Sequence, residues 1–284
     1  MASRKIPTNA LEVIAMKLGC STALFNQLDL YGALQHITWA GYDGAELACL
    51  GNLVRHIELN TTKCYINEVK SIAKKHRLEL FAIHTDVGGL PGEDKIKSMT
   101  KMFDVALKLS IPIVTMHPGG KSGDLETTIQ EFEYTRKLSE QAERRGITLA
   151  VKAHAGASVY NTATLLQLLA EVDSPALGVT FDPTHFCRAG EDPSEAVFKI
   201  GKKIVHVHLR DYSHFEQFMA TPEQQIPGRG EIDFLRILRR LKDVGYDKAV
   251  DTLNIGAFTY PLSKQMGIAG EARGYISRCL HELK

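Results

Sequence analysis

Eight short apolar runs, each followed by a segment with a helical pattern, constrain the fold of this 284-residue chain. The runs are rich in Val, Ile, Leu or Thr, as expected for strands buried on both faces. They are MKLGCS (16–21), GAELA (44–48), LELFAIH (78–84), IPIVTMH (111–117), ITLAVKAH (147–154), LGVTFD (177–182), IVHVHLRD (204–211) and KAVDTLN (248–254). Alternating strands and helices form right-handed crossovers in a parallel sheet, and a barrel of eight such units takes about 250 residues. The pattern therefore predicts an α/β fold, a single (β/α)8 TIM barrel domain over residues 1–284.

The clearest helical segments are 125–146, 192–203 and 234–245. Gly146 is a suitable C-terminal stop for the first helix. Asp192 can cap the second helix, and Glu195 three residues later completes a capping-box pattern. An open doubly wound sheet is the competing fold, but it requires a glycine-rich turn after the first strand, and TALFNQ has no glycine.

The bulk composition argues against several classes of protein. The chain has 34 Lys and Arg against 33 Asp and Glu, so charge gives no general attraction to nucleic acid or to anionic membranes. No run reaches the length of a membrane span, and no signal peptide is evident at the N-terminus. The five cysteines form no Cys-x-x-Cys pair, which indicates free thiols rather than a disulfide framework. These features predict a cytoplasmic protein.

The predicted strand ends carry many residues of the types that bind metals and substrates. In barrel enzymes, the active site lies at the C-terminal ends of the strands. These ends contribute Glu46, His84, His117, Lys152, His154, Asp182, His185, His208, Arg210 and Asp211. A single histidine at such a position is more often a packing residue than a ligand, but its repetition over most strands favours an active site.

Two of these strand ends are the most informative. Asp182 ends an apolar strand, and His185 follows three residues later, so the pair offers a carboxylate and an imidazole to a divalent ion. On the next strand, His206 and His208 share the inward face, since side chains alternate along a strand. We expect His208, nearer the top, to be the ligand and His206 to be a packed core residue. Arg210 and Asp211 either bind substrate or pair with each other.

The ordered motifs GYDGAELA, LAVKAH, GVTFDPTH, VHVHLRD and PGRGEIDF resemble those of the sugar-phosphate isomerase/epimerase superfamily, with its xylose-isomerase-like barrel. In sugar-acting members, a Glu, an Asp, a His and a Glu on strands 5 to 8 hold one divalent metal ion. Asp182 and His208 match the middle two, and His185 matches a substrate-contacting histidine. The two glutamates are absent, since Lys152 stands at the first position and Leu253 or Asn254 at the last, so the chain is a divergent member.

The resemblance implies an isomerase, epimerase or lyase that removes a proton next to the carbonyl of a keto sugar or polyol. Two glutamates usually act as its acid–base pair, so this chain needs a rebuilt site. Our leading hypothesis places Mn, Zn, Co or Fe on His154, Asp182 and His208, with Lys152 and His185 as the catalytic residues. The predicted substrate-binding residues are Glu46, His84, His117, Arg188, Arg210 and Asn254. A homo-oligomer remains open, because dimers and tetramers are common in such families.

Two alternatives remain beside the metal-dependent enzyme. In the first, Lys152 replaces the metal, either in a salt bridge with Asp182 or as a Schiff-base former, in a metal-free enzyme or a sugar-binding protein. The second is an apurinic-site endonuclease, whose strand histidines match His84 and His117. The nuclease is disfavoured, because the two glutamates and an Asp-x-His motif after strand 7 are missing and no basic face is evident.

Overall fold

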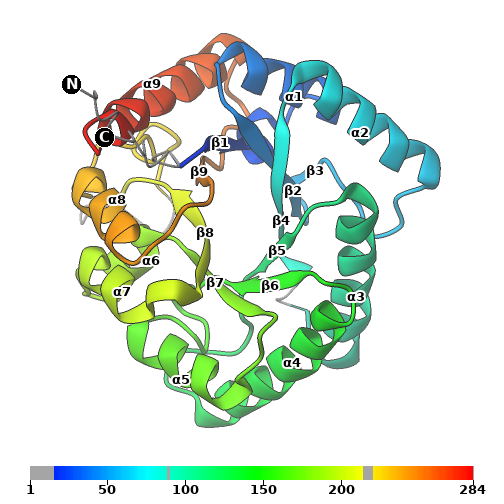
Figure 1. The fold of residues 1–284 in the computed structure, drawn as a ribbon, viewed down its shortest axis with the longest axis vertical. Coiled ribbons are helices and arrows are strands. Elements are labelled where there is room, and N and C mark those ends of the chain that lie inside the picture. Colours follow the sequence, from blue (N-terminus) through cyan, green and yellow to red (C-terminus); the bar gives the residue numbers. More distant parts are fainter. Residues whose placement is uncertain (1–15, 88–89, 214–219, 284) are drawn as a thin grey trace, which may run out of the picture.

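Eight parallel strands close into a barrel in the computed structural model, which describes residues 16–87, 90–213 and 220–283 (Figure 1). Closure is direct, because β1 pairs in parallel with both β2 and β9. The barrel strands are β1 (Leu18–Ser21), β2 (Gly44–Leu50), β4 (Glu79–Thr85), β5 (Ile113–Met116), β6 (Thr148–Val151), β7 (Leu177–Phe181), β8 (Ile204–Leu209) and β9 (Val250–Thr252). Each lies within one of the eight apolar runs or extends it slightly, so the predicted (β/α)8 fold is confirmed.

Helices form an outer ring around the strands (Figure 1). They are α1 (Leu30–Trp39), α2 (Lys63–His76), α3 (Gly92–Leu109), α4 (Leu125–Glu143), α5 (Thr162–Val172), α6 (Pro183–Arg188), α7 (Pro193–Ile200), α8 (Phe234–Asp243) and α9 (Leu262–His281), with short 3-10 turns at Thr22–Phe25 and Gly201–Lys203. The short strand β3 (Val54–Arg55) pairs antiparallel with β2 outside the barrel. Within the described ranges, no helix has the length and apolar character needed to span a bilayer.

The predicted helices are present, with one difference in capping. Asp192 caps α7 by accepting a hydrogen bond from the Ser194 backbone N–H, as expected. Glu195 does not complete a capping box, because its carboxylate contacts the guanidinium of Arg236 on α8 at 3.3 Å. An interhelical ion pair has therefore replaced the expected local contact.

Two register irregularities shape the barrel interior. Between β2 and β4 the extra residue is Phe81, and between β7 and β8 it is Val205. Glycines make room for both, since a Cβ atom at Gly44 would lie 2.5 Å from the Phe81 ring and one at Gly178 would lie 2.6 Å from Val205. Such irregularities re-aim the side chains that follow them. Above them the inward side chains are polar.

Candidate active site

Four histidines follow one another along successive strand ends and form what we call the histidine arc: His84, His117, His154 and His185. Neighbouring ring centroids lie 4.9, 4.8 and 4.3 Å apart along this series. His84 Nε2 and His117 Nε2 are 2.9 Å apart, so one of the two nitrogens donates a hydrogen bond to the other. His117 and His154 are half-buried, whereas the outer two are buried, so the middle of the arc is where solvent reaches it.

Burial keeps the imidazoles of the arc neutral. It lowers the pKa of His84, and it lowers those of His117 and His185 far more, with the positive charge of Lys152 acting in the same direction on His84 and His117. The pKa of His154 falls to about 4 for the same two reasons. At neutral pH the arc therefore offers hydrogen-bond donors and acceptors without positive charge.

Lys152 lies beyond the end of β6 and faces Asp182, which follows β7. Its Nζ atom is 3.4 Å from Asp182 Oδ2, and both side chains are buried. Burial lowers the pKa of Lys152, although Asp182 opposes that shift. Burial would raise the pKa of Asp182, but Arg210, His185 and Lys152 together hold it well below its ordinary value. Lys152 is thus a buried amine of reduced basicity beside a firmly ionised carboxylate.

Asp182 also begins α6. Its Oδ1 accepts hydrogen bonds from the backbone N–H of Thr184 at 3.2 Å and from the Thr184 hydroxyl at 2.6 Å. Arg210 donates to that hydroxyl at 2.8 Å. Asp182 therefore has two roles, because one oxygen caps α6 and the other faces Lys152.

His185 is held in one tautomer by its contacts. Its Nδ1 accepts the Ala155 backbone N–H at 3.2 Å, so Nε2 carries the proton. That Nε2 faces Asp182 Oδ2 at 3.6 Å. His185 is buried rather than on the surface, and its N–H is aimed at the same carboxylate oxygen as Lys152.

A second polar group, which we call the inner cluster, consists of Glu46, His206, His208 and Asp251. Glu46 reaches across the barrel from β2, and its Oε2 lies 2.9 Å from His206 Nε2 and 2.6 Å from His208 Nε2. Asp251 Oδ2 is 3.4 Å from His206 Nε2. All four side chains are at most 1% exposed. In the described part of the chain, Glu46, His206 and His208 are the one group of three whose potential metal-ligand atoms all lie within 4.8 Å of one another.

In the inner cluster, the carboxylates of Glu46 and Asp251 both face the imidazole of His206. Burial would raise the pKa of Glu46, but His208, His84 and His206 hold it well below its ordinary value. Burial opposes protonation of His206, yet its bond to Glu46 and the charge of Asp251 raise its pKa. Burial and the Glu46 charge raise the pKa of Asp251 to about 7. Burial lowers the pKa of His208 to about 3.

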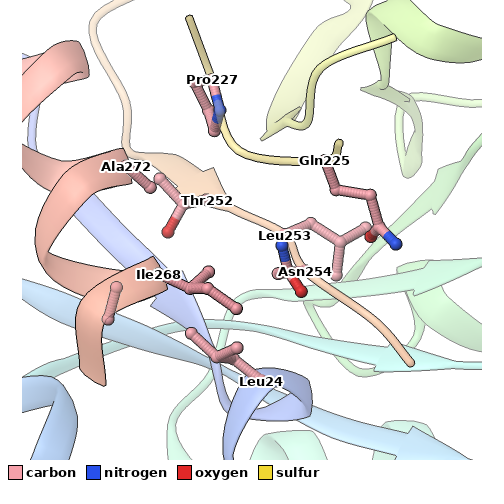
Figure 2. A pocket seen from close by; sticks show the side chains of 9 residues that line it. Leu24, Gln225, Pro227, Thr252, Leu253, Asn254, Ile268 and Ala272 are labelled. Atoms are coloured by element: carbon pink, nitrogen blue, oxygen red, sulfur yellow. The ribbon is translucent and has the colours of Figure 1, made fainter. Parts of the chain in front are cut away.

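At the end of β9, Thr252, Leu253 and Asn254 lie beside Gln225, Ile268 and Ala272 (Figure 2). Leu253, at the position where the resemblance expects a glutamate, is buried against Ala23, Ala48, Leu50 and Val54. Asn254 donates to the Pro222 carbonyl at 2.6 Å, which ties β9 to the preceding loop. The small cavity beside it has a volume of about 10 Å³ and is lined by nine side chains including Asn254 and Gln225. That volume holds about one water molecule, so it is no substrate pocket.

Arg210 and Asp211 do not pair with each other. Asp211 instead accepts backbone N–H groups of Tyr212, Gly228, Gly230 and Ile232, at 2.7 to 3.2 Å. It therefore organises the loop after β8, while Arg210 points toward Asp182 through Thr184. Arg188 is half-buried at the end of α6. The ion pair between Arg210 and Asp211 considered from sequence does not form, because four backbone N–H groups already bind the Asp211 carboxylate.

The structure brings most of the sequence-predicted residues together. Lys152, His154, Asp182 and His185 lie side by side with His84 and His117, and His84 also contacts the His208 ring at 4.8 Å between centroids. The metal ligands predicted from sequence, His154, Asp182 and His208, do not form a described group whose ligand atoms all lie within 4.8 Å of one another. His208 and Glu46 contact each other instead, together with His206, which was expected to be packed core.

Sequence reasoning missed the functional potential of His206 and Asp251. The alternation of β8 put His206 on the inward face beside His208, and the same alternation on β9 could have marked Asp251. Neither signal indicates the partner, since Glu46 is 160 residues from His206 in sequence.

A cleft opens beside the ends of β2 and β4. It has a volume of about 600 Å³, within the range of small-molecule sites. Its polar lining includes Asn52, Arg55, Asn60 and Asp86. Asp86, which lines the cleft, lies two residues after His84, the member of the histidine arc on β4.

Comparison with known families decides the assignment of the fold. A family model described as xylose isomerase-like TIM barrel matches residues 34–255. The chain belongs to this family. The resemblance drawn from the sequence motifs is thereby confirmed.

Individual relatives support the family and span several activities. An uncharacterised protein of Methanocaldococcus jannaschii is 26% identical over 88% of this chain and 87% of its own length. The inosose dehydratase of Clostridium perfringens is 26% identical over 55% of this chain, and the match spans 62% of that enzyme. The crystal structure of the IolI protein with a bound zinc atom has a TM-score of 0.78 at 20% identity, covering 94% of this chain and 99% of that one. The isomerase, epimerase or lyase class predicted from sequence agrees with the activities named for relatives of this chain.

The metal site expected from the family does not fit these residues, but a different one does. At the family position, the Lys152 side chain lies against Asp182 and Leu253 is apolar, so two of four ligands are lost. The inner cluster instead offers two imidazole nitrogens and a carboxylate oxygen, which suit divalent transition metals. Several of its buried atoms lack hydrogen-bond partners, namely Glu46 Oε1, His208 Nδ1 and both Asp251 carboxylate oxygens.

Proposed function

We propose that this chain is an isomerase, epimerase or dehydratase that acts on a small keto sugar or cyclic polyol ketone by removing a proton next to the carbonyl. The observation that carries the proposal is the buried Lys152 amine, 3.4 Å from Asp182, at the end of β6. A buried lysine of lowered pKa can serve as a base near neutral pH. The family relatives named inosose dehydratase and inosose isomerase act on substrates of this kind, as their names state.

In this proposal, each residue around Lys152 has a part. Lys152, as the neutral amine favoured by burial, takes the proton from the carbon beside the carbonyl. Return of the proton by Lys152 to the neighbouring carbon isomerises the substrate, and loss of a neighbouring hydroxyl as water dehydrates it. Epimerisation additionally requires a second acid that delivers a proton to the opposite face of the carbon. His185, whose Nε2 carries a proton, supplies the acid at a substrate oxygen.

The remaining site residues bind the substrate. His117 and His154 are the half-buried members of the arc, so they are the ones within reach of substrate hydroxyl groups. The cleft lined by Asn52, Arg55, Asn60 and Asp86 opens beside the ends of β2 and β4 and has room for a sugar-sized molecule. Asn254 has no part in this proposal, because its amide is bound to Pro222.

A divalent metal ion is part of the proposal, and its identity among Mn, Zn, Co and Fe remains to be measured. The zinc atom named for the related IolI structure supports a metal in this barrel. When bound, the ion polarises oxygen atoms as a Lewis acid. The ligand set His154, Asp182 and His208, which was predicted from sequence, suits a metal ion poorly because Lys152 lies against Asp182.

Conversion of a substrate panel by the wild-type chain and by Lys152→Met tests the proposal. The panel contains inososes, ketohexoses and ketopentoses, incubated with each metal and analysed by chromatography and NMR. We expect the wild type to convert at least one compound and Lys152→Met to convert none while retaining its circular dichroism spectrum. Binding without conversion by the wild type would favour a sugar-binding protein and contradict the proposal.

The Schiff-base alternative has one observation in its favour, the buried amine of lowered pKa, which is nucleophilic when neutral. Borohydride reduction in the presence of a converted substrate distinguishes it. A covalent mass increase that is absent from Lys152→Met would assign Lys152 as a nucleophile, whereas an unchanged mass leaves it as a base.

A further inference from the structure

We propose that Glu46, His206 and His208 bind a divalent transition-metal ion inside the barrel, at a position different from the one used by the rest of the family. This inference deepens the metal-dependent form of the proposed function and rests on it only for the role of the ion. The geometry of the inner cluster alone supports the binding itself.

Suitable metal-ligand atoms of His206, His208 and Glu46 converge inside the barrel. His206 and His208 lie two residues apart on β8, so both side chains point inward from the same face. Their Nε2 atoms meet a single carboxylate oxygen of Glu46 at 2.9 and 2.6 Å. Two imidazoles and one carboxylate form a set with open positions, which is suited to Zn, Fe, Co or Mn.

Three buried carboxylate oxygens of the inner cluster lack hydrogen-bond donors. Glu46 and Asp251 are both completely buried, and His206 Nε2 lies 2.9 Å from Glu46 Oε2 and 3.4 Å from Asp251 Oδ2. Glu46 Oε1 and both Asp251 oxygens lack a hydrogen bond. Burying carboxylates without such partners is costly, so a divalent ion between them would stabilise the fold.

Gly19 leaves room for the Asp251 carboxylate inside the barrel. A Cβ atom at Gly19 on β1 would overlap the Asp251 carboxylate, so only glycine accommodates it there. The carboxylate nevertheless receives no protein hydrogen bond at this position. A carboxylate held next to His206 without donors of its own is arranged to balance a cation bound by its neighbours.

The family position repels a cation in this chain. Lys152 lies 3.4 Å from Asp182, and Arg210 reaches the same carboxylate through Thr184. The charge of Arg210 acts on Asp182, and Lys152 occupies the space beside that carboxylate in either protonation state, whereas Glu46 carries negative charge in the inner cluster. A divalent ion is therefore expected in the inner cluster and not beside Asp182.

Metal stoichiometry in matched variants tests this assignment. The wild-type chain, purified without chelator, is incubated with Zn, Mn or Co and its bound metal is measured by plasma mass spectrometry and calorimetry. We expect one ion per chain in the wild type, in His154→Gln and in Lys152→Met, and at least a hundredfold weaker binding in His206→Gln and Glu46→Gln. Glu131→Gln, a buried carboxylate outside the cluster, is the control and should bind normally.

Two results would overturn the inference. One is loss of metal in His154→Gln with full binding in His206→Gln, which would restore the ligand set predicted from sequence. The other is a wild type that binds none of the three ions. If His206→Gln does not fold, X-ray absorption of the cobalt-loaded wild type decides, since the inference requires two histidine nitrogens and carboxylate oxygen around the ion. Lys152→Met that binds metal but lacks turnover separates this test from that of the proposed function.

Discussion

Two buried lysine–carboxylate pairs in this molecule have different surroundings. Lys95 on α3 pairs with Glu131 on α4 in direct contact, with the ring of Tyr134 5.2 Å from Lys95 Nζ. Lys152 and Asp182 stand 3.4 Å apart at the strand ends, within reach of Arg210 and the histidine arc. The first pair joins two helices of the outer ring, and Glu131 also binds the Gly119 backbone in the loop after β5. The second is open, and its members are shared with other polar groups, which is the arrangement expected of a residue that must exchange a proton.

The largest expected effect is on turnover. Lys152→Met should lower kcat by about a hundredfold to ten-thousandfold, the usual contribution of a general acid or base. Lys95→Met should leave the kcat of the folded protein nearly unchanged, because Lys95 lies between two helices of the outer ring. Steady-state kinetics on any substrate found in the panel measures both. Equal losses of kcat in the two variants would remove the distinction between the pairs.

Stability should respond in the opposite order. Breaking a buried ion pair by removing one partner typically costs about 3 to 5 kcal/mol, so Lys95→Met should lower the free energy of unfolding by that amount. Lys152→Met should cost less, since Asp182 retains two bonds from Thr184 and the charge of Arg210. Urea denaturation followed by circular dichroism gives both values. A larger loss for Lys152→Met would favour the structural salt bridge considered from sequence.

Acid should destabilise the site through the histidine arc. The folded-state pKa of His154 is about 4, below its ordinary value of 6.5, so the unfolded chain binds the proton more readily. The stabilising contribution is therefore complete above pH 6.5 and is lost as the pH falls toward 4. We expect His154→Gln to reduce this loss by about 2 kcal/mol, allowing for partial exposure. Melting temperatures of both proteins from pH 7.5 to 4 test it, and parallel curves would contradict the neutral, buried histidine.

The smallest effect should come from an exposed ion pair. Arg229 contacts Glu271 through two nitrogens at 2.5 and 2.6 Å, but both side chains are more than 40% exposed. Surface pairs contribute up to about 1 kcal/mol. Arg229→Gln should therefore change the free energy of unfolding by less than about 1 kcal/mol, measured in the same urea series. A loss as large as that of Lys95→Met would show that burial does not explain the ranking.

The fold was predictable because each strand is a local apolar run, and a run such as LGVTFD needs no knowledge of its neighbours. Lys152, Asp182 and His185 were predictable as a group because parallel strands place their ends at one edge. The pairing of Glu46 with His206 and His208 was not predictable, since it crosses the barrel and follows a register irregularity at Glu46. Asn254 was assigned to substrate from its place near the family's strand 8 glutamate, and its bond to Pro222 was not predictable because the sequence does not specify the path of that loop.

The most direct test of Lys152 as the base is hydrogen exchange into the substrate. Each compound of the panel is incubated with the metal-loaded protein in D2O, and deuterium at the carbon beside the carbonyl is measured by NMR and mass spectrometry. The account predicts incorporation of deuterium by the wild type and by Lys95→Met, and none above the uncatalysed rate by folded Lys152→Met. Exchange that persists in Lys152→Met, or its absence in the wild type with a compound that binds, would contradict it.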